Sequence, residues 1–188
     1  MVGIINYNSL KTFKGVGVRV FISYHRADEK YRDKIEKMLK NNCISYFVVP
    51  KSVNFNGKNH QYIKDIINEK MCDCDVILCI VGKETYSRPH VDWELHEALK
   101  GRINQRKGIL VVMLERRLDN KNSINYATFP NRLQDNKDYI IIEQFCSLSY
   151  KINSALNEAL SKSWDESIQV NNRRQPMQLR QGKYFDEN

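Results

Sequence analysis

The stretch DVILCIV, residues 75–81, is apolar after its first residue and shows almost no alternation of polar and apolar positions. A strand that is buried on both faces has this composition, and such strands are typical of parallel sheets. Four further runs share the pattern: VRVFISY (18–24), ISYFVV (44–49), GILVVML (108–114) and YIIIEQF (139–145). The sequence therefore predicts a five-stranded, mostly parallel sheet.

Segments with helical periodicity alternate with these runs. Apolar residues recur three and four positions apart in four segments: 28–40, 61–71, 90–103 and 149–161. Asp28 is placed to cap the first of them. A long polar stretch, 119–138, occupies the place of a helix before the last strand. Alternating strands and helices predict an α/β, flavodoxin-like fold with sheet order 2-1-3-4-5 and helices on both faces.

The length of 188 residues favours one domain with shorter segments at its ends. We expect an irregular lead-in over residues 1–16, a domain over 17–161 and a polar C-terminal extension over 162–188. Four apolar residues of the extension are candidates for packing against the domain: Trp164, Met177, Leu179 and Phe185.

Composition argues against several classes of partner. The net charge of +8 is spread along the chain, and no basic block is interleaved with aromatic residues, so we expect no nucleic-acid binding. No apolar run reaches the length that spans a bilayer, and the first residues lack a secretory cleavage pattern, so we expect no membrane contact. Five cysteines are an odd number and fit a reducing cytoplasm. Cys72 and Cys74 have no second ligand pair, so we expect no metal.

The predicted topology locates a ligand crevice. In open α/β sheets, ligands bind beyond the carboxyl ends of the strands, where the strand order reverses, which here lies between the first and third strands. The first strand ends in four residues with polar or aromatic side chains: Ser23, Tyr24, His25 and Arg26. The third strand leads through residues 83–89 into the helix that begins at His90. We therefore expect SRPHVDWELHEAL (87–99) to face the end of the first strand.

A helical wheel separates the acidic residues of this segment. The apolar face centres on Leu95, and Glu94 lies at its border in the first turn, where proximity to the helix N-terminus favours the charged form. Asp92 takes the other border and is equally suited to capping, whereas Glu97 and Trp93 fall on the polar side. Geometry alone leaves Glu94 balanced between a functional carboxylate and a surface group that stabilises the first turn.

Several chemistries are excluded because their motifs are absent. The chain has no G-x-x-x-x-G-K-[ST] phosphate loop, no G-x-G-x-x-G after a predicted strand and no G-x-S-x-G elbow. A phosphate-accepting receiver of the same topology needs an aspartate at the end of the third strand, where this chain has Val81 and Gly82.

Two segments resemble TIR domains. RVFISYHRADEKY (19–31) is similar to the family's first strand and following loop, in which a hydrophobic strand ends in serine and an aromatic residue. ETYSRPHVDWEL (84–95) is similar to its third helix, with a tryptophan directly before Glu-Leu as in the bacterial TIR-like branch. His90 departs from the pattern, because the family usually has tryptophan there. Over residues 17–161 the chain more closely resembles the TIR-like proteins of the bacterial Thoeris anti-phage defence system.

The resemblance implies an enzyme whose catalytic glutamate falls on Glu94. The implied activity is that of an NAD+ nucleosidase and ADP-ribosyl cyclase, which cleaves the nicotinamide–ribose bond and closes ADP-ribose into a cyclic messenger. NAD+ is then a substrate and no cofactor is needed, and a separate NAD-depleting effector senses the messenger. The residues placed to bind NAD+ are Ser23, Tyr24, His25, Arg26, Tyr86, His90 and Trp93.

These assignments have alternatives. Tyr24 is also suited to packing at a strand end, Arg26 to a solvated position and Trp93 to contact with another subunit. Many TIR domains act without catalysis, by TIR–TIR assembly through the loop after the second strand. The alternative function is therefore a homo-oligomeric interaction module in immune signalling.

Overall fold

The computed structural model of the chain describes residues 17–48, 65, 67–69, 71–101, 105–115 and 123–178. Five parallel strands form one sheet in the order β2-β1-β3-β4-β5. The strands are β1 (Val20–Ser23), β2 (Tyr46–Val48), β3 (Val76–Val81), β4 (Gly108–Met113) and β5 (Ile141–Gln144). The predicted fold class and strand order are confirmed, and each strand lies inside the apolar run that predicted it.

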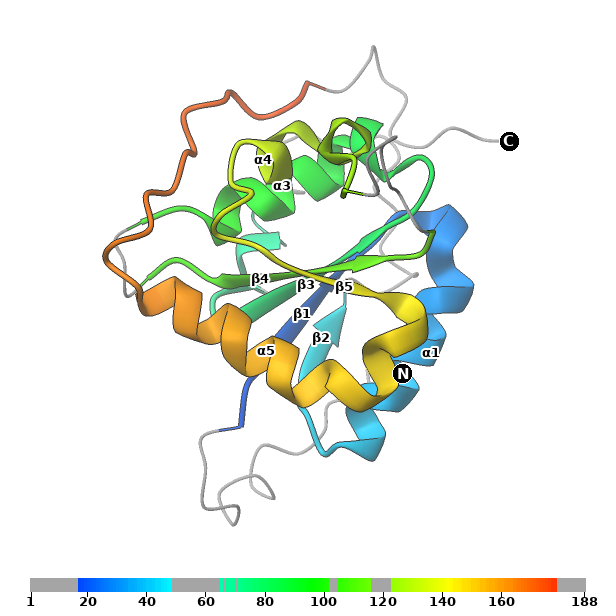
Figure 1. Cartoon of the computed structure of the whole chain (residues 1–188). Coiled ribbons are helices and arrows are strands. Elements are labelled where there is room, and N and C mark those ends of the chain that lie inside the picture. Colours follow the sequence, from blue (N-terminus) through cyan, green and yellow to red (C-terminus); the bar gives the residue numbers. More distant parts are fainter. Residues whose placement is uncertain are drawn as a thin grey trace.

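Helices cover both faces of the sheet (Figure 1). On one face lie α1 (Glu29–Asn41) and α5 (Leu148–Trp164), and on the other lie α3 (Pro89–Ala98) and α4 (Asn131–Gln134). Residues 65, 67–69 and 71 are also helical and fall within the predicted helix 61–71.

Each central strand supplies two hydrophobic cores, because successive side chains of a strand point to opposite faces. In β3, Leu78 packs in the core beneath α1 and α5, whereas its neighbour Cys79 packs in the core beneath α3. All six residues of β3 are buried. The lack of polar alternation in this run follows from the burial of both faces.

Two segments differ in detail from the predicted elements. α3 ends at Ala98, five residues before the predicted end, and Gly101 adopts a left-handed backbone with φ of 93° that favours glycine. The polar stretch 119–138 contains a 3-10 turn (Tyr126–Thr128) and the single turn of α4.

Asp28 does not cap α1, and that prediction was wrong, because its side chain accepts no capping hydrogen bond. The carboxylate turns instead towards the end of β3, where it accepts a hydrogen bond of 3.5 Å from the Thr85 hydroxyl. It fills the space beside Gly82, at which a Cβ atom would come within 2.3 Å of Asp28 Oδ2. Asp28 thus joins the start of α1 to the loop that follows β3.

Residues 165–178 run from the end of α5 back across the layer of α3 and α4 (Figure 1). Ile168 and Val170 pack against the core beneath α3. Arg106 holds the start of this segment through three backbone carbonyls, those of Ser163, Asp165 and Ile168, at 3.1, 2.7 and 3.3 Å. The first part of the predicted C-terminal extension therefore packs against the domain.

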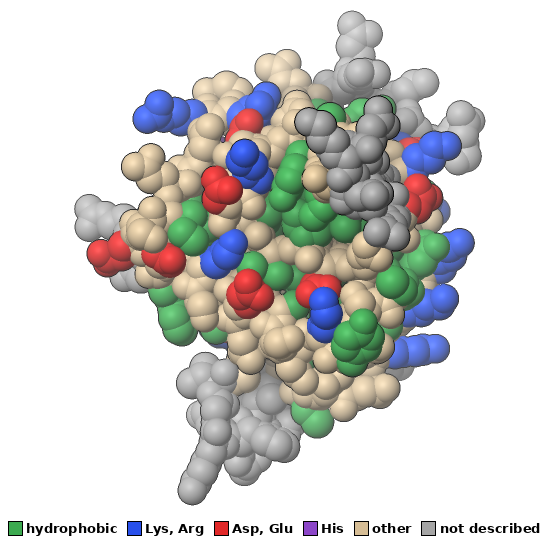
Figure 2. All heavy atoms as spheres, in the orientation of Figure 1, with side chains coloured by type: hydrophobic (Ala, Val, Ile, Leu, Met, Phe, Trp, Pro, Cys, Tyr) green, Lys and Arg blue, Asp and Glu red, His purple; other side chains and the backbone are tan. Residues whose placement is uncertain are grey.

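Figure 2 shows basic and acidic side chains interspersed over the middle of one face of the molecule. Among the residues that the structure describes, no helix is both long enough and apolar enough to cross a membrane.

Candidate functional site

The end of β1 and the start of α3 form the candidate site. Ser23, the last residue of β1, is fully buried and pairs in register with Cys79 of β3. Beyond β3, Gly82 and a 3-10 turn (Thr85–Ser87) carry the chain to Pro89, which opens α3 at a position where its missing N–H costs nothing. Glu94 follows in the second turn of α3, one turn later than predicted.

Glu94 is buried, with 7% of its surface exposed. Its Oε2 atom has no hydrogen-bond partner among the described residues. Burial raises the pKa of Glu94 from 4.5 to about 8, and the Ser23 hydroxyl beside it acts in the opposite direction. The expectation that the helix N-terminus favours the charged form was wrong, because burial dominates and the carboxyl lies beyond the first turn.

Two further titratable groups flank Ser23: the thiol of Cys79, which is its partner in β3, and the phenol of Tyr24, which follows it in the chain. The thiol of Cys79 is fully buried, and its pKa is raised first by burial and then by the charge of Glu94. Tyr24 is half-buried, and burial also raises the pKa of its phenol. The guanidinium of Arg32 lies 5.2 Å from the centre of the Tyr24 ring and favours the ionised phenol. The predicted residues Ser23 and Glu94 therefore lie beside each other, whereas Tyr24 packs against the core beneath α1 and α5, on the other face of the sheet.

The two histidines belong to the same edge of the sheet. The pKa of His90 is lowered to about 4, chiefly by burial and to a smaller extent by electrostatic repulsion from His25 and Arg88. The imidazole of His90 is therefore neutral at physiological pH. Its ring stacks on that of Trp93, with 5.7 Å between the ring centres and 27° between the planes.

Two predicted ligands lie at the periphery of the candidate site. Arg26 is exposed in the turn before α1, and Tyr86 is 53% exposed in the turn before α3. Neither side chain is enclosed by the groups around Glu94.

The helical wheel misplaced Trp93. This side chain is only 2% exposed, and its indole N–H donates a hydrogen bond of 2.7 Å to the carbonyl of Met177. It was assigned to the polar face because the wheel considered only contacts with the sheet, whereas residues 171–178 cover the other side of α3. Its surface is therefore not open to another subunit or to a ligand in this conformation.

Asp92, the rival carboxylate, has a structural partner that sequence reasoning missed. Arg132 is fully buried and forms a two-pronged ion pair with Asp92, at 3.0 and 3.2 Å. Arg132 lies in a polar stretch 40 residues away, and no local pattern distinguishes it from the other basic residues there. The pairing leaves Glu94 as the carboxyl of α3 that faces the end of β1.

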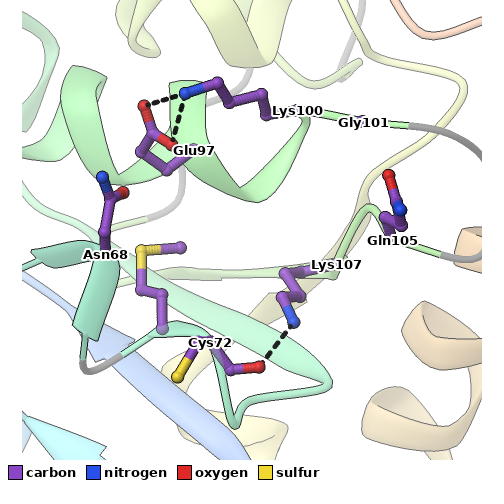
Figure 3. Close-up of a pocket in the computed structure, with 8 residues that line it drawn as sticks. Asn68, Cys72, Glu97, Lys100, Gly101, Gln105 and Lys107 are labelled. Carbon is purple, nitrogen blue, oxygen red and sulfur yellow. Dashed lines mark hydrogen bonds and ion pairs between the residues drawn. The ribbon is translucent and has the colours of Figure 1, made fainter.

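A shallow cavity of about 300 Å³ lies elsewhere on the molecule (Figure 3). Cys72 and Lys107, which line it, come before β3 and β4, so the cavity lies at the opposite edge of the sheet from Glu94. Its charged groups are already engaged: Lys107 Nζ donates to the Cys72 carbonyl at 3.3 Å, and Lys100 pairs with Glu97 at 3.1 Å. This cavity is separate from the candidate site.

The described part of the chain contains no group of three or more His, Cys, Asp or Glu side chains that could hold a metal ion. The candidate site consists of the buried carboxyl of Glu94, the hydroxyl of Ser23 and, at the start of α3, the neutral imidazole of His90.

A five-stranded parallel sheet in this order is flavodoxin-like, and with an acidic residue of α3 beside the end of β1 it is consistent with a TIR-like domain. The family model "Thoeris protein ThsB, TIR-like domain" matches residues 21–119, just over half of the chain, and the chain belongs to this family. A comparison with curated proteins finds no match. The chain is therefore a TIR-like protein of an anti-phage defence system that has other components.

Proposed function

We propose that the chain cleaves NAD+ between nicotinamide and ribose and produces a cyclic ADP-ribose-type messenger. The observation that carries this proposal is the carboxyl group of Glu94, which is buried at the switch point of the sheet beside Ser23 and has an oxygen without a hydrogen-bond partner among the described residues. Ligands bind at this point in open α/β sheets. Membership in the TIR-like family supports the same substrate class.

The reaction suits a single carboxylate. The bond between ribose C1′ and the nicotinamide nitrogen breaks, and its electron pair passes to the cationic ring, so nicotinamide leaves neutral and needs no proton. The ribose acquires oxocarbenium character, which a negative charge held close by stabilises. A nucleophilic atom of the same ADP-ribose then forms a bond to C1′ and loses its proton, which closes the ring.

The raised pKa of Glu94 fits a site that becomes active when substrate is bound. With an empty site, burial favours the neutral carboxyl up to a pKa of about 8. The positive nicotinamide ring brings an opposite charge next to the carboxyl and lowers its pKa, so the catalytic anion forms with NAD+ in place. Exclusion of water from this enclosed site favours cyclisation over hydrolysis.

The proposal gives each surrounding residue a role in binding NAD+. Ser23 and Tyr24 contact the ribose, and His25 and Arg26 lie along the path of the pyrophosphate. His90 offers a neutral ring for stacking, and the exposed Tyr86 binds the outer part of the dinucleotide. Trp93 supports His90 from beneath instead of contacting NAD+ itself.

A second function is favoured by the low exposure of Glu94, which is 7%. A buried carboxyl is compatible with an interaction module that signals by TIR–TIR assembly and needs no substrate. In that case the remaining components of the defence system recognise the assembled chain directly.

The replacement Glu94→Gln separates the two functions, because it keeps the shape and removes the charge. Cells that express the chain without its effector are infected, and small nucleotides are extracted and compared by mass spectrometry. We expect Glu94→Gln to lower the messenger by at least about a hundredfold. Glu97→Gln, the same change three residues along α3, is the matched control and should leave the messenger within twofold. Messenger at the wild-type level in Glu94→Gln would contradict the enzymatic proposal.

The effector provides a second test. In cells that contain both components, Glu94→Gln should abolish the loss of cellular NAD+ that follows infection. Addition of extract from infected wild-type cells, which contains the messenger, should bring the loss of NAD+ back. NAD+ loss that persists in Glu94→Gln, together with a change in oligomeric state on infection, would favour the assembly function.

A further inference from the structure

Residues 171–177, here called the C-terminal strap, lie against the side of α3 that faces away from the sheet. We propose that the strap, together with Arg132 and Asp92, positions α3 and thereby directs the side chain of Glu94 into the site. This inference rests on the proposed function of Glu94, and Asp92 and Arg132 act in it as positioning residues.

Arg132 connects three elements. From α4, its guanidinium reaches Asp92 of α3 at 3.0 and 3.2 Å. It also donates to the strap, to the Asn172 side chain at 2.6 Å and to the Arg174 carbonyl at 3.0 Å. The side chain is fully buried, and a two-pronged pair with a carboxylate fixes orientation as well as distance.

Three outward-facing residues of α3 contact the strap directly. The carboxylate of Asp92 accepts a hydrogen bond of 2.8 Å from the backbone N–H of Met177. The indole of Trp93 donates to the Met177 carbonyl at 2.7 Å, and the His96 carbonyl accepts from the Asn172 amide at 2.9 Å. These bonds restrain the rotation of α3 about its axis. Two of them are made by Asp92 and Trp93, the residues directly before Glu94.

The strap has anchors of its own. Asn136 donates to the Asn171 carbonyl and accepts from the Asn171 N–H, both at 2.8 Å. Arg174 pairs with Asp135 at 2.8 Å. Asp135 and Asn136 follow α4 directly, so the strap is fixed to the same helical turn that carries Arg132. The strap can therefore hold the outer side of α3 in place.

The geometry matters because α3 has only ten residues and its catalytic side chain lies near the middle. A displacement of about 1 Å at a reacting group can cost about a hundredfold in rate. The strap and Arg132, which hold the outer side of α3, therefore contribute to catalysis without contacting the substrate.

The Met177 N–H provides a selective perturbation. Met177→Pro removes the donor to Asp92, whereas the matched control Met177→Ala removes a similar amount of side chain and keeps the N–H. Trp164→Phe is introduced into every variant, so that Trp93 is the single remaining tryptophan and its fluorescence reports whether the strap is in place.

Two readouts follow the position of Glu94. The first is the effect of Glu94→Gln on the unfolding free energy of each protein, measured at pH 5 and at pH 9. The change in this effect between the two pH values depends on the burial of Glu94 and can be measured without any catalysis. The second is the rate of nicotinamide release from NAD+ at saturating concentration, together with KM. The other titrating groups near the strap (Asp92, His96 and Asp135) are the same in both members of each pair, so their contributions cancel.

We expect Met177→Pro to shift the fluorescence emission of Trp93 to the red. The effect of Glu94→Gln on the unfolding free energy should change with pH by no more than half as much in the Met177→Pro background as in the wild type. The kcat for nicotinamide release should fall about tenfold, with KM within twofold. Met177→Ala should change none of these. The inference would be overturned if Trp93 emission is unchanged in Met177→Pro. It would also be overturned if the emission shifts while kcat and the pH dependence of the Glu94→Gln stability effect stay the same. If Met177→Pro reduces the pH dependence of the Glu94→Gln stability effect but no variant releases nicotinamide, the positioning role is supported and the proposed function is contradicted.

Discussion

Glu94→Gln should stabilise the protein, and the gain should grow with pH. The folded state raises the pKa of Glu94 from 4.5 to about 8 by burial. Between these two values the folded state binds more protons than the unfolded state, so the free energy of unfolding falls as pH rises. Glutamine cannot ionise and escapes this loss.

The size of the effect follows from the same shift. A rise from 4.5 to about 8 corresponds to about 5 kcal/mol at 1.36 kcal/mol per pKa unit. About 1 kcal/mol of this cost is present at pH 5 and nearly all of it at pH 9, so the two proteins should diverge by up to about 4 kcal/mol over this range. Water that enters the site on ionisation reduces the difference, and we expect between about 2 and 4 kcal/mol.

Denaturant unfolding at pH 5, 7 and 9 measures this divergence directly. Glu97→Gln is the control, because its carboxylate pairs with Lys100 near the surface and should contribute no more than about 1 kcal/mol at any pH. A Glu94→Gln difference that stays constant or shrinks from pH 5 to pH 9 would show that the carboxyl is not buried in the way described.

Three further results are expected. Arg132→Met leaves the buried Asp92 carboxylate unpaired and should cost about 3–5 kcal/mol of unfolding free energy, and a loss below about 1 kcal/mol would contradict the buried ion pair. Gly108→Ala places a Cβ atom 2.3 Å from the Ala159 carbonyl oxygen and should lower Tm, because backbone cannot yield as a side chain can. In the native protein a thiol reagent should modify the exposed cysteines rapidly and spare the buried ones until unfolding, and rapid labelling of either buried thiol would contradict the described core. The exposed cysteines are Cys43, Cys72 and Cys146, and the buried ones are Cys74 and Cys79.

The sheet could be predicted because its information is local. Runs such as DVILCIV are apolar on both faces of a strand, and burial between two helical layers is what that composition requires. The strand order followed from the common arrangement of five parallel strands and placed the end of β1 opposite α3. The neighbourhood of Ser23 and Glu94 was therefore accessible from the sequence.

The environment of α3 could not be predicted, because it depends on distant residues. Trp93 and Asp92 are buried by the strap and by Arg132, which lie about 40 to 85 residues further along the chain. A helical wheel contains only the residues of the helix, so it assigned Trp93 to solvent. The charge state expected for Glu94 was wrong for the same reason, since the degree of burial is a property of the packed domain.

Isotope tracing follows the proposed cleavage of NAD+ itself. NAD+ labelled in the nicotinamide-bearing ribose is added to lysates of infected cells that express the wild-type chain, Glu94→Gln or Glu97→Gln, and labelled nucleotides are identified by mass spectrometry. We expect the wild type and Glu97→Gln to form a labelled product that lacks nicotinamide and has the mass of cyclised ADP-ribose. Glu94→Gln should form at least about a hundredfold less of it. Equal product in all three lysates, or none in the wild type, would contradict the proposed function.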